Sequence, residues 1–460
     1  MIIALIFILL FQYVYNDDHL QFGFGTAATA SFKNYHIRVK QPISCENSVQ
    51  YSGYIDNLVT NEHVFFIFLE SRFAPKTDPV ILSLNGQLGC SSITNVWFET
   101  GLCLVKKAGI ETNPFSFNNI ANILYVDQPT GVGYSYSSGK KPSTCAQVTE
   151  TIYWFLQSFF TEFKQFARND FHIAGTSYAS HFVPSLATHI IRENRYASSS
   201  NKLPIQLASI ILGNGYINPR AHKLSYAEYS CDNNKYKPIY DKVTCQKMKT
   251  NRRQCNYLLN QCDSCTPSLL YCKRTLVDPF YSKTHLNPYD IRKTCLLNNH
   301  IDSCYSEIQD IVEYANSQEV KTEYGIDSEA GEFQNCNSHV KARFDMTKDS
   351  LVNTMDQIEK VLATNIRVLV YAGDMNWYNN WYGQTDWLSK LDWIGQVGFN
   401  DAKDKDWFSY VSGQKAGTVK SFLNLSFVKV FNAGYYSIYD QPANMIDLYS
   451  RWVMNVSLGY

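Results

Sequence analysis

The sequence predicts an α/β fold in which helices flank a mostly parallel central sheet. Short apolar runs with strand character alternate with helical segments before residue 214 and after residue 336. Residues 215–335 break this alternation, because they are polar, rich in Tyr and Cys, and lack strand periodicity. Residues 169–184 have the pattern of a strand, a sharp turn and a helix, with Ser177 at the turn. Alternating strands and helices imply parallel strands that are covered on both faces.

The predicted elements follow the chain in the order that such a sheet requires. Residues 51–70 alternate and then become uniformly apolar, which predicts an antiparallel hairpin. Residues 215–335 are predicted to form an insertion, a helical cap rich in disulfides. The remaining predicted elements are strands at 79–85, 121–126, 208–213, 367–371 and 427–431, and helices at 151–166, 348–362 and 442–453.

The overall composition excludes two classes of partner. Apolar residues make up 45% of the 460 residues, which is enough for a full core. Lys and Arg together number 41, and so do Asp and Glu. A chain without net charge has no global field to attract nucleic acid or an anionic membrane, so we expect neither as a partner.

Residues 1–22 are predicted to be a signal peptide. The first 15 residues are mostly Ile, Leu and Phe, a run too short for a membrane span. No Lys or Arg lies near the start, and no clear small-residue cleavage site occurs before about residue 23, so an uncleaved anchor is the alternative. No later segment is long enough to span a membrane, and we expect no membrane association after signal removal.

The thirteen cysteines indicate an oxidising compartment. They are not spaced as zinc ligands, and most lie between Cys231 and Cys336. In a chain with a secretory start this pattern predicts a disulfide framework, and the odd total leaves at least one cysteine outside it. We therefore expect no metal and no other cofactor.

The turn around Ser177 is the first candidate for chemistry. It has the sequence Gly175-Thr176-Ser177-Tyr178-Ala179, which departs from the Gly-x-Ser-x-Gly pattern of hydrolases at its last position. A strand-turn-helix connection of this kind is more often structural than catalytic. Its significance therefore depends on whether the rest of the chain supplies partners for the serine.

Several collinear stretches show that the chain resembles the serine carboxypeptidase family over roughly residues 50–455. The stretches that carry the resemblance are Glu70-Ser71-Arg72, Asn85-Gly86 with Gly89-Cys90-Ser91-Ser92, Asp127-Gln128-Pro129, residues 131–137, residues 175–184, Gly213-Asn214-Gly215, residues 289–295 and Tyr371-Ala372-Gly373-Asp374.

This resemblance implies an α/β-hydrolase fold with a disulfide-rich cap insertion. It divides the chain into a first core part at 23–214, the cap at 215–335 and a second core part at 336–460. It also implies disulfide pairs, but leaves Cys45, Cys103 and Cys145 unassigned. The implied pairs are Cys90–Cys336, Cys231–Cys245, Cys255–Cys272, Cys262–Cys265 and Cys295–Cys304.

The resemblance places a catalytic triad whose chemistry is altered. Ser177 stands at the nucleophile position, but the position of the triad Asp is Asn376 and the position of the triad His is Tyr435. None of the ten histidines lies after His339, so the final loop cannot supply the base. His172 and His181 flank the serine, and we interpret both as packing residues.

The substrate-binding positions implied by the resemblance are also partly changed. Asn85, Gly86 and Glu99 are kept, whereas Ser83 replaces a Trp and Thr176 replaces a second acid. We expect Glu99 to stay ionised without that acid and to repel a ligand carboxylate. The oxyanion donors would be the backbone N–H groups of Gln87 and Tyr178.

The leading hypothesis is a serine carboxypeptidase-like protein of the secretory or vacuolar pathway that lacks normal peptidase activity. It would bind the C-terminus of a peptide or protein in the old cleft. The alternatives are an active carboxypeptidase, a hydrolase or acyltransferase with an unusual base at Ser177, and a decaying copy without a selected role. Asn424 and Asn455 each begin a triplet of the N-glycosylation form.

Overall fold

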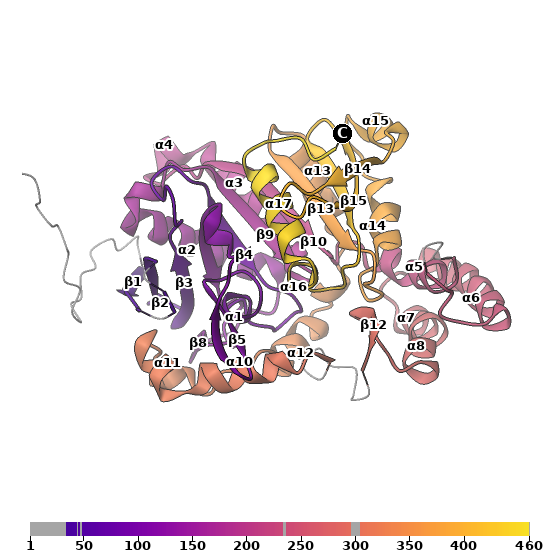
Figure 1. The fold of residues 1–460 in the computed structure, drawn as a ribbon, viewed down its shortest axis with the longest axis horizontal. Helices are drawn as coiled ribbons and strands as arrows, with labels where there is room; N and C mark the ends of the chain where they lie inside the picture. The colour runs from indigo at the N-terminus through magenta and orange to yellow at the C-terminus, as the bar shows by residue number, and fades with distance from the viewer. Residues whose placement is uncertain (1–33, 44, 47, 233–235, 296–303, 460) are drawn as a thin grey trace, which may run out of the picture.

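The computed structural model describes residues 34–459 apart from residues 44, 47, 233–235 and 296–303 (Figure 1). The predicted signal peptide at residues 1–22 lies outside the described residues. Within them, no helix is both long enough and apolar enough to cross a membrane.

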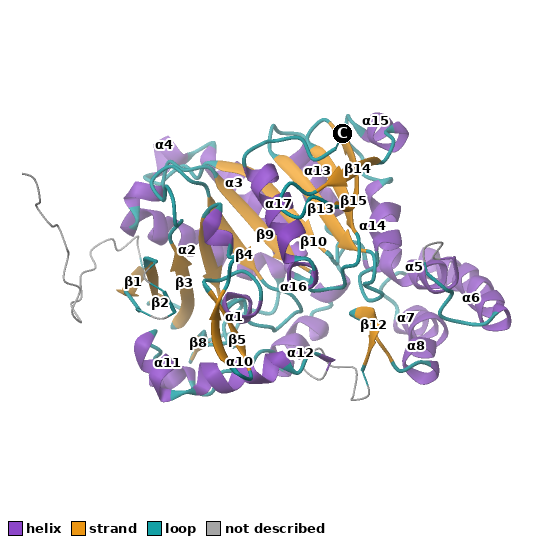
Figure 2. Cartoon of the chain, viewed as in Figure 1, coloured by secondary structure: helices purple, strands orange, loops and turns teal. Residues whose placement is uncertain are grey.

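A twelve-stranded sheet forms the centre of the molecule (Figure 2). Its middle strands pair in parallel in the order β7-β4-β9-β10-β13-β16, while the pairs outside them are antiparallel. The predicted α/β-hydrolase fold with mostly parallel central strands is therefore confirmed. The strands are β1 (Tyr35–Lys40), β2 (Gln50–Asn57), β3 (Glu62–Leu69), β4 (Val80–Leu84), β7 (Asn122–Val126), β8 (Tyr136–Ser137), β9 (Phe171–Thr176), β10 (Leu207–Gly213), β13 (Arg367–Gly373), β14 (Lys405–Phe408), β15 (Lys415–Phe422) and β16 (Leu425–Val430).

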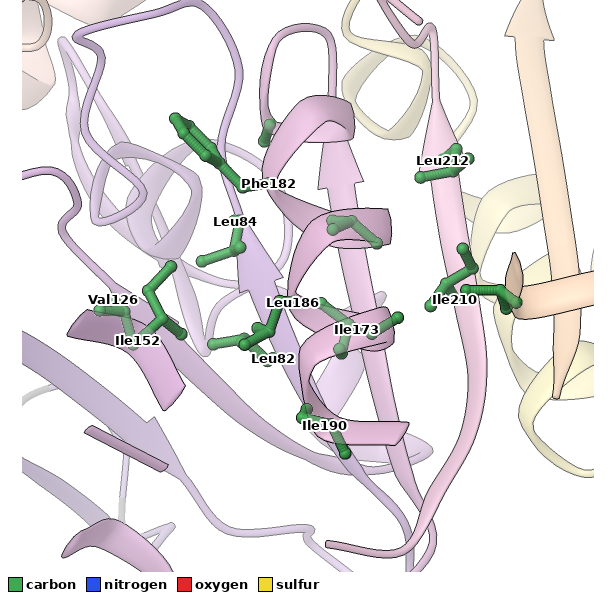
Figure 3. Packing of buried hydrophobic residues seen from close by; sticks show 14 of the residues in the cluster. Leu82, Leu84, Val126, Ile152, Ile173, Phe182, Leu186, Ile190, Ile210 and Leu212 are labelled. Carbon is green, nitrogen blue, oxygen red and sulfur yellow. The ribbon is translucent and has the colours of Figure 1, made fainter. Parts of the chain in front are cut away.

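Alternate residues of the central strands enter two separate cores, one on each face of the sheet. Val80 and Leu82 of β4 pack on one face, whereas Ile81 between them packs on the other. Because side chains alternate across a strand, a strand that is buried on both faces needs a continuous apolar run. Figure 3 shows side chains of the first core, with Leu82 and Ile173 of the strands beside Leu186 of a covering helix.

Helices cover both faces of the sheet. The first core is covered by α2 (Cys145–Glu162), α3 (Ala179–Asn194) and α13 (Met355–Leu362), and the second by α1 (Thr94–Phe98), α10 (Glu307–Asn316) and α17 (Pro442–Val453). The helix predicted at 151–166 begins earlier, because the Thr144 side chain caps its first turn. The helix predicted at 348–362 begins only at Met355, because Lys348 has a positive φ of 59° and a short 3-10 turn follows it. The other helices of the second half are α12 (Ser338–Met346), α14 (Trp381–Leu388), α15 (Gln396–Asp401) and α16 (Ser437–Asp440), and α4 (Ala197–Ser200) follows α3.

Several strands at the edges of the sheet were not predicted. β14 and β15 pair antiparallel beyond β16, and β1 pairs antiparallel with β2. β14 is exposed at three of its four residues, so it lacks the apolar run that marks a buried strand. A separate hairpin of β5 (Cys103–Lys106) and β6 (Gly109–Thr112) was missed for the same reason, since β6 is exposed throughout.

The insertion at residues 215–335 has two parts that make different contacts. The first part is a helical lobe that stands beside the sheet at the right of Figure 1, where α5 packs on α14. Its helices enclose a small core of their own, which includes Met248, Leu259 and Leu276. The second part, with α10, packs on the sheet, where Ile308 and Ile311 join the second main core. The elements of the insertion not yet given are α5 (Pro219–Asp232), α6 (Lys242–Gln261), α7 (Thr266–Cys272), α8 (Asp278–Lys283), β11 (Leu286–Asn287), β12 (Asp290–Thr294) and α11 (Gln318–Glu323).

Four of the six disulfides lie within the insertion, and the other two join residues of the core. The structure contains all five pairs implied by the resemblance and adds a sixth, Cys45–Cys103, between two cysteines that the sequence left unassigned. Cys145 is the free cysteine of the described residues.

The two predicted glycosylation sites differ in their surroundings. The side-chain nitrogen of Asn424, to which a glycan would be attached, donates to three backbone carbonyls, those of Leu362, Thr364 and Ile366. A glycan there would disrupt these bonds, so the structure argues against Asn424 as an acceptor. Asn455 is exposed just after the end of α17.

Candidate functional site

Ser177 lies at a sharp turn between β9 and α3. Its φ is 55°, a left-handed conformation that is uncommon for a residue with a side chain. The turn is bonded to the end of β10, because the Ser177 N–H donates to the Gly213 carbonyl over 2.9 Å. Gly175 is required here, since a Cβ on it would lie 2.5 Å from Val183. Ala179 occupies the position of the second glycine of the hydrolase pattern and is fully buried without disrupting the turn.

The Ser177 hydroxyl accepts a hydrogen bond from Asn379. The Asn379 amide nitrogen lies 3.0 Å from Ser177 Oγ and 2.9 Å from the carbonyl oxygen of Asn214. The second bond fixes the direction of the amide, because a reversed amide would place its oxygen against that carbonyl. Asn379 therefore presents a donor to the serine, and an amide donor cannot remove the hydroxyl proton. Sequence reasoning missed Asn379; its place three residues after Asn376 in the same loop was the available signal.

Tyr435 occupies the position that the sequence assigned to the base. Its N–H donates to the Tyr289 carbonyl over 2.7 Å, and its carbonyl accepts from the Asn214 side chain over 2.8 Å. The ring is 1% exposed and packs edge-on against the rings of Tyr289 and Tyr436. The backbone of this loop is therefore fixed by bonds that do not depend on the side chain of residue 435.

The Tyr435 hydroxyl points between the serine and the oxyanion turn. It lies beside Ser177, yet it makes no hydrogen bond of normal geometry to any described group. A Cβ built on Gly86 would lie 3.0 Å from this oxygen. Burial raises the pKa of Tyr435 far above the ordinary value of 10, so the phenol stays protonated and cannot act as a base.

Asn376, which the resemblance places at the triad Asp position, bonds within its own loop. Its Nδ2 donates to the Asn379 carbonyl over 3.4 Å, and its Oδ1 accepts from the Asn379 N–H over 3.3 Å. An uncharged amide used in this way cannot stabilise a cation at residue 435. Asn376 instead braces the backbone of the residue that contacts Ser177.

The turn after β4, where the resemblance places the oxyanion donors, is bonded to the start of α3. Gly86 has a φ of 39°, and its carbonyl accepts from the Ala179 N–H over 3.3 Å, which ties the turn to the start of α3. The Gln87 side chain donates to the Tyr289 hydroxyl over 2.8 Å. Within the described residues, no backbone partner is found for the N–H of Gln87 or of Tyr178. Both remain candidates for donors to an anion.

The substrate-binding candidates lie around the same turn, and one prediction about them is wrong. The Asn85 amide donates to the Ser91 carbonyl over 2.8 Å, and Thr176 interacts with the Tyr371 hydroxyl. Glu99, after α1, accepts from the Tyr439 N–H over 3.1 Å. Burial raises the pKa of Glu99 to about 8, so this carboxyl is mostly protonated at neutral and acidic pH. The expectation that Glu99 stays ionised considered only the missing second acid and overlooked desolvation.

The histidines near the serine are engaged elsewhere. His172 contacts Ser209 Oγ at 2.7 Å, and His181 contacts the Val352 carbonyl at 2.9 Å. Burial lowers the pKa of His172 to about 3 and that of His181 to about 4, so both rings are neutral. The described residues contain no cluster of three or more His, Cys, Asp or Glu that could hold a metal.

Comparison with known proteins identifies the family. A family model for serine carboxypeptidases matches residues 40–455, which is most of the chain. The chain belongs to the serine carboxypeptidase family. Among curated relatives of this family, carboxypeptidase Y of Candida albicans is 36% identical over 447 residues, which cover 94% of this chain and 79% of that protein. Carboxypeptidase Y of Komagataella phaffii is 35% identical, over 91% of this chain and 79% of that protein.

A solved structure of a carboxypeptidase has the same fold. The Kex1 prohormone-processing carboxypeptidase of Saccharomyces cerevisiae superimposes with a TM-score of 0.78 at 21% identity, covering 89% of this chain and 91% of that one. This similarity supports the assignment of the α/β-hydrolase fold, while the side chains around Ser177 define the chemistry of this serine carboxypeptidase-family chain.

Proposed function

We propose that this serine carboxypeptidase-family protein does not hydrolyse peptides through an ordinary triad and instead binds the C-terminus of a peptide or protein in the old cleft. The observation that carries the proposal is the shell around the Ser177 hydroxyl. Its neighbours there are the Asn379 amide, which donates to it, and the Tyr435 phenol, whose pKa is raised by burial. Neither group can accept the proton that serine must lose to attack a carbonyl.

The expected loss of peptide hydrolysis is large. Loss of the catalytic His costs on the order of 10⁶ in rate in one serine protease, and an Asn at the Asp position costs about 10⁴ in another. The two losses are not additive, because the triad acts as a unit. The tyrosine at position 435 is therefore sufficient to remove ordinary turnover.

Binding is supported by what the cleft retains. The Gln87 N–H has no backbone partner in the described residues and can donate to a ligand, and the neutral form of Glu99 would not repel a carboxylate. The six disulfides favour an oxidising compartment, so we place the protein in the secretory pathway, in a vacuole-like compartment or outside the cell.

The competing proposal is an active carboxypeptidase that uses a base outside the last loop. The retained elbow at Ser177 favours it, and so do the names of the relatives, which are carboxypeptidases. The two proposals predict different behaviour towards the same substrate.

The deciding experiment is release of the C-terminal residue from an N-blocked dipeptide by the purified full chain, from acidic to slightly alkaline pH. The matched control is Ser177→Ala. We expect the same background rate in both proteins. Turnover that disappears in Ser177→Ala would overturn the proposal and support the active enzyme.

A further inference from the structure

We propose that a cavity on the far side of the molecule from Ser177 is a second binding site, in which Arg367, Lys403 and Lys405 hold the phosphate group of a small phosphate ester. The cavity is enclosed by the starts of β13 and β14, the turn between β15 and β16, and the residues that follow α17. It lies beside β14 and the end of α15, at the top right of Figure 1.

The cavity lies at the opposite end of the strands from Ser177. Arg367 is the first residue of β13, whereas Ser177 follows the last residue of β9. β9, β10 and β13 pair in parallel, so their starts lie together at one end and the Ser177 turn lies at the other. None of the residues assigned to the Ser177 site lines this cavity. The cavity is therefore separate from that site.

The size of the cavity fits an organic phosphate. Its volume is about 570 Å³, within the range of about 300–1,000 Å³ that is typical of small-molecule sites. A water molecule takes about 30 Å³ in the liquid, and a bare phosphate ion is only a few times larger, so the ion alone would leave most of the space to solvent. The hydroxyls of Ser421 and Ser426 also line the cavity and offer uncharged polar groups to the rest of an ester.

The charged side chains that line the cavity are all cationic. They are Arg367, Lys403 and Lys405, and no Asp or Glu of the described residues lines it. A cavity of similar size beside β8 differs in this respect, because it combines Lys141 with two glutamates. A phosphate monoester carries a charge of about −1.5 to −2 at pH 7, which complements a lining of three cations without a carboxylate.

The three cations have no ion-pair partner in the described part of the chain, although acidic residues are close in sequence. Asp406, next to Lys405, is paired instead with Lys415 at 2.7 Å. Asp404 is exposed and does not line the cavity. The positive charge that faces the cavity is therefore not neutralised by the neighbouring carboxylates.

Arg367 is the side chain best placed to hold a phosphate group. It is half-buried, its Cζ lies 4.8 Å from the centre of the Trp452 ring, and its Nη1 donates to the Trp452 carbonyl over 2.6 Å. No other acceptor for this guanidinium is found among the described residues. Burial lowers the pKa of Arg367 below its ordinary value, and the charge of Asp170 offsets only part of this effect. A guanidinium fixed in this way has N–H groups left for bidentate bonding to a phosphate.

The experiment is calorimetric titration of the full chain with glucose 6-phosphate, glucose and inorganic phosphate. We expect glucose 6-phosphate to bind at least about tenfold more tightly than glucose, because only the ester carries the charge that the three cations attract. It should also bind more tightly than inorganic phosphate, which fills little of the cavity. Equal affinity for the ester and glucose, equal affinity for the ester and inorganic phosphate, or no measurable binding of the ester would each overturn the proposal.

The first variant tests the guanidinium. Arg367→Gln should weaken the binding of glucose 6-phosphate about tenfold, with little change for glucose. Arg343→Gln is the matched control, because Arg343 is also half-buried and donates to backbone carbonyls, but lines neither cavity. The control should bind the ester as the unmodified chain does.

The second variant combines Lys403→Gln with Lys405→Gln. Both side chains are exposed, so these substitutions leave the core intact. We expect this double variant to bind the ester about fivefold more weakly, since exposed cations contribute less than a half-buried guanidinium. Thermal melting checks the folding of each variant, and unchanged affinity in either folded variant would contradict the proposal. The dipeptide assay at Ser177 tests the proposed function separately, so the two can fail independently.

Discussion

The two sides of the site differ in how far their side chains depart from the family pattern. The first side, formed by the turns after β4 and β9, has the retained Ser177 and Gly86 in left-handed backbone, at φ values of 55° and 39°. The second side, formed by the loops after β13 and β16, is also held by backbone hydrogen bonds but carries Asn376 and Tyr435 where the family pattern has acid and base. The fold of the site and the chemistry of its side chains therefore depart from the family pattern to different degrees.

Asn214 explains how the second side keeps its shape. Its side chain donates to the Tyr435 carbonyl over 2.8 Å and accepts from the Gly373 N–H over 3.0 Å, while its own carbonyl accepts from Asn379. One buried residue at the end of β10 therefore fixes both altered loops through backbone atoms. The side chains at 376 and 435 can change without moving the loops that carry them.

The strongest test of this separation restores the chemistry on the second side alone. Asn376→Asp with Tyr435→His should raise dipeptide hydrolysis by about 10³ over the unmodified chain, because the loops already hold the triad backbone. The assay is release of the C-terminal residue, and adding Ser177→Ala should abolish the gain. A folded double variant without activity would mean that loop position and side-chain chemistry are not separable here.

A second test removes the Asn214 side chain, which bonds to both altered loops. Asn214→Ala removes several buried hydrogen bonds and leaves the Gly373 N–H without its acceptor, so we expect the free energy of unfolding to fall by about 4 kcal/mol. Urea denaturation measures this change. Asn194→Ala, which removes two bonds of a half-buried side chain to Ile205, is the control and should have the smaller effect.

The third and smallest effect concerns Glu99, which follows α1 and accepts a bond from the Tyr439 loop. Its folded-state pKa of about 8 lies above its unfolded value, so its contribution to stability is complete below about pH 4 and is lost as pH rises toward 8. The Glu99→Gln variant lacks this pH-dependent contribution, because an amide side chain does not ionise in this range. Between pH 5 and pH 8 the unmodified chain should lose about 3 kcal/mol more stability than the variant, as measured by denaturation at each pH. Parallel pH profiles for the two proteins would show that Glu99 is ionised in the folded state.

The sequence predicted the parts of this protein that depend on strong local patterns. The buried strands and the sharp turn at Ser177 follow from apolar runs and from the strand-turn-helix pattern. The assignment of positions 376 and 435 to the triad rests on the resemblance and stays a prediction. The exposed edge strands lacked such runs. The bond from Asn379 to Ser177 and the raised pKa of Glu99 depend on burial and on contacts between distant segments, which periodicity does not encode.

The Cys90–Cys336 disulfide has a consequence for how this chain folds. It joins residues 246 positions apart, and the loop that it closes contains the whole insertion. In the loop-closure account, a crosslink over this length lowers the entropy of the unfolded chain by an amount worth roughly 5 kcal/mol. Once this disulfide has formed, folding no longer has to close the long loop that contains the insertion, because the unfolded chain is already closed there. Its stability is therefore tied to the redox state of the compartment in which it folds.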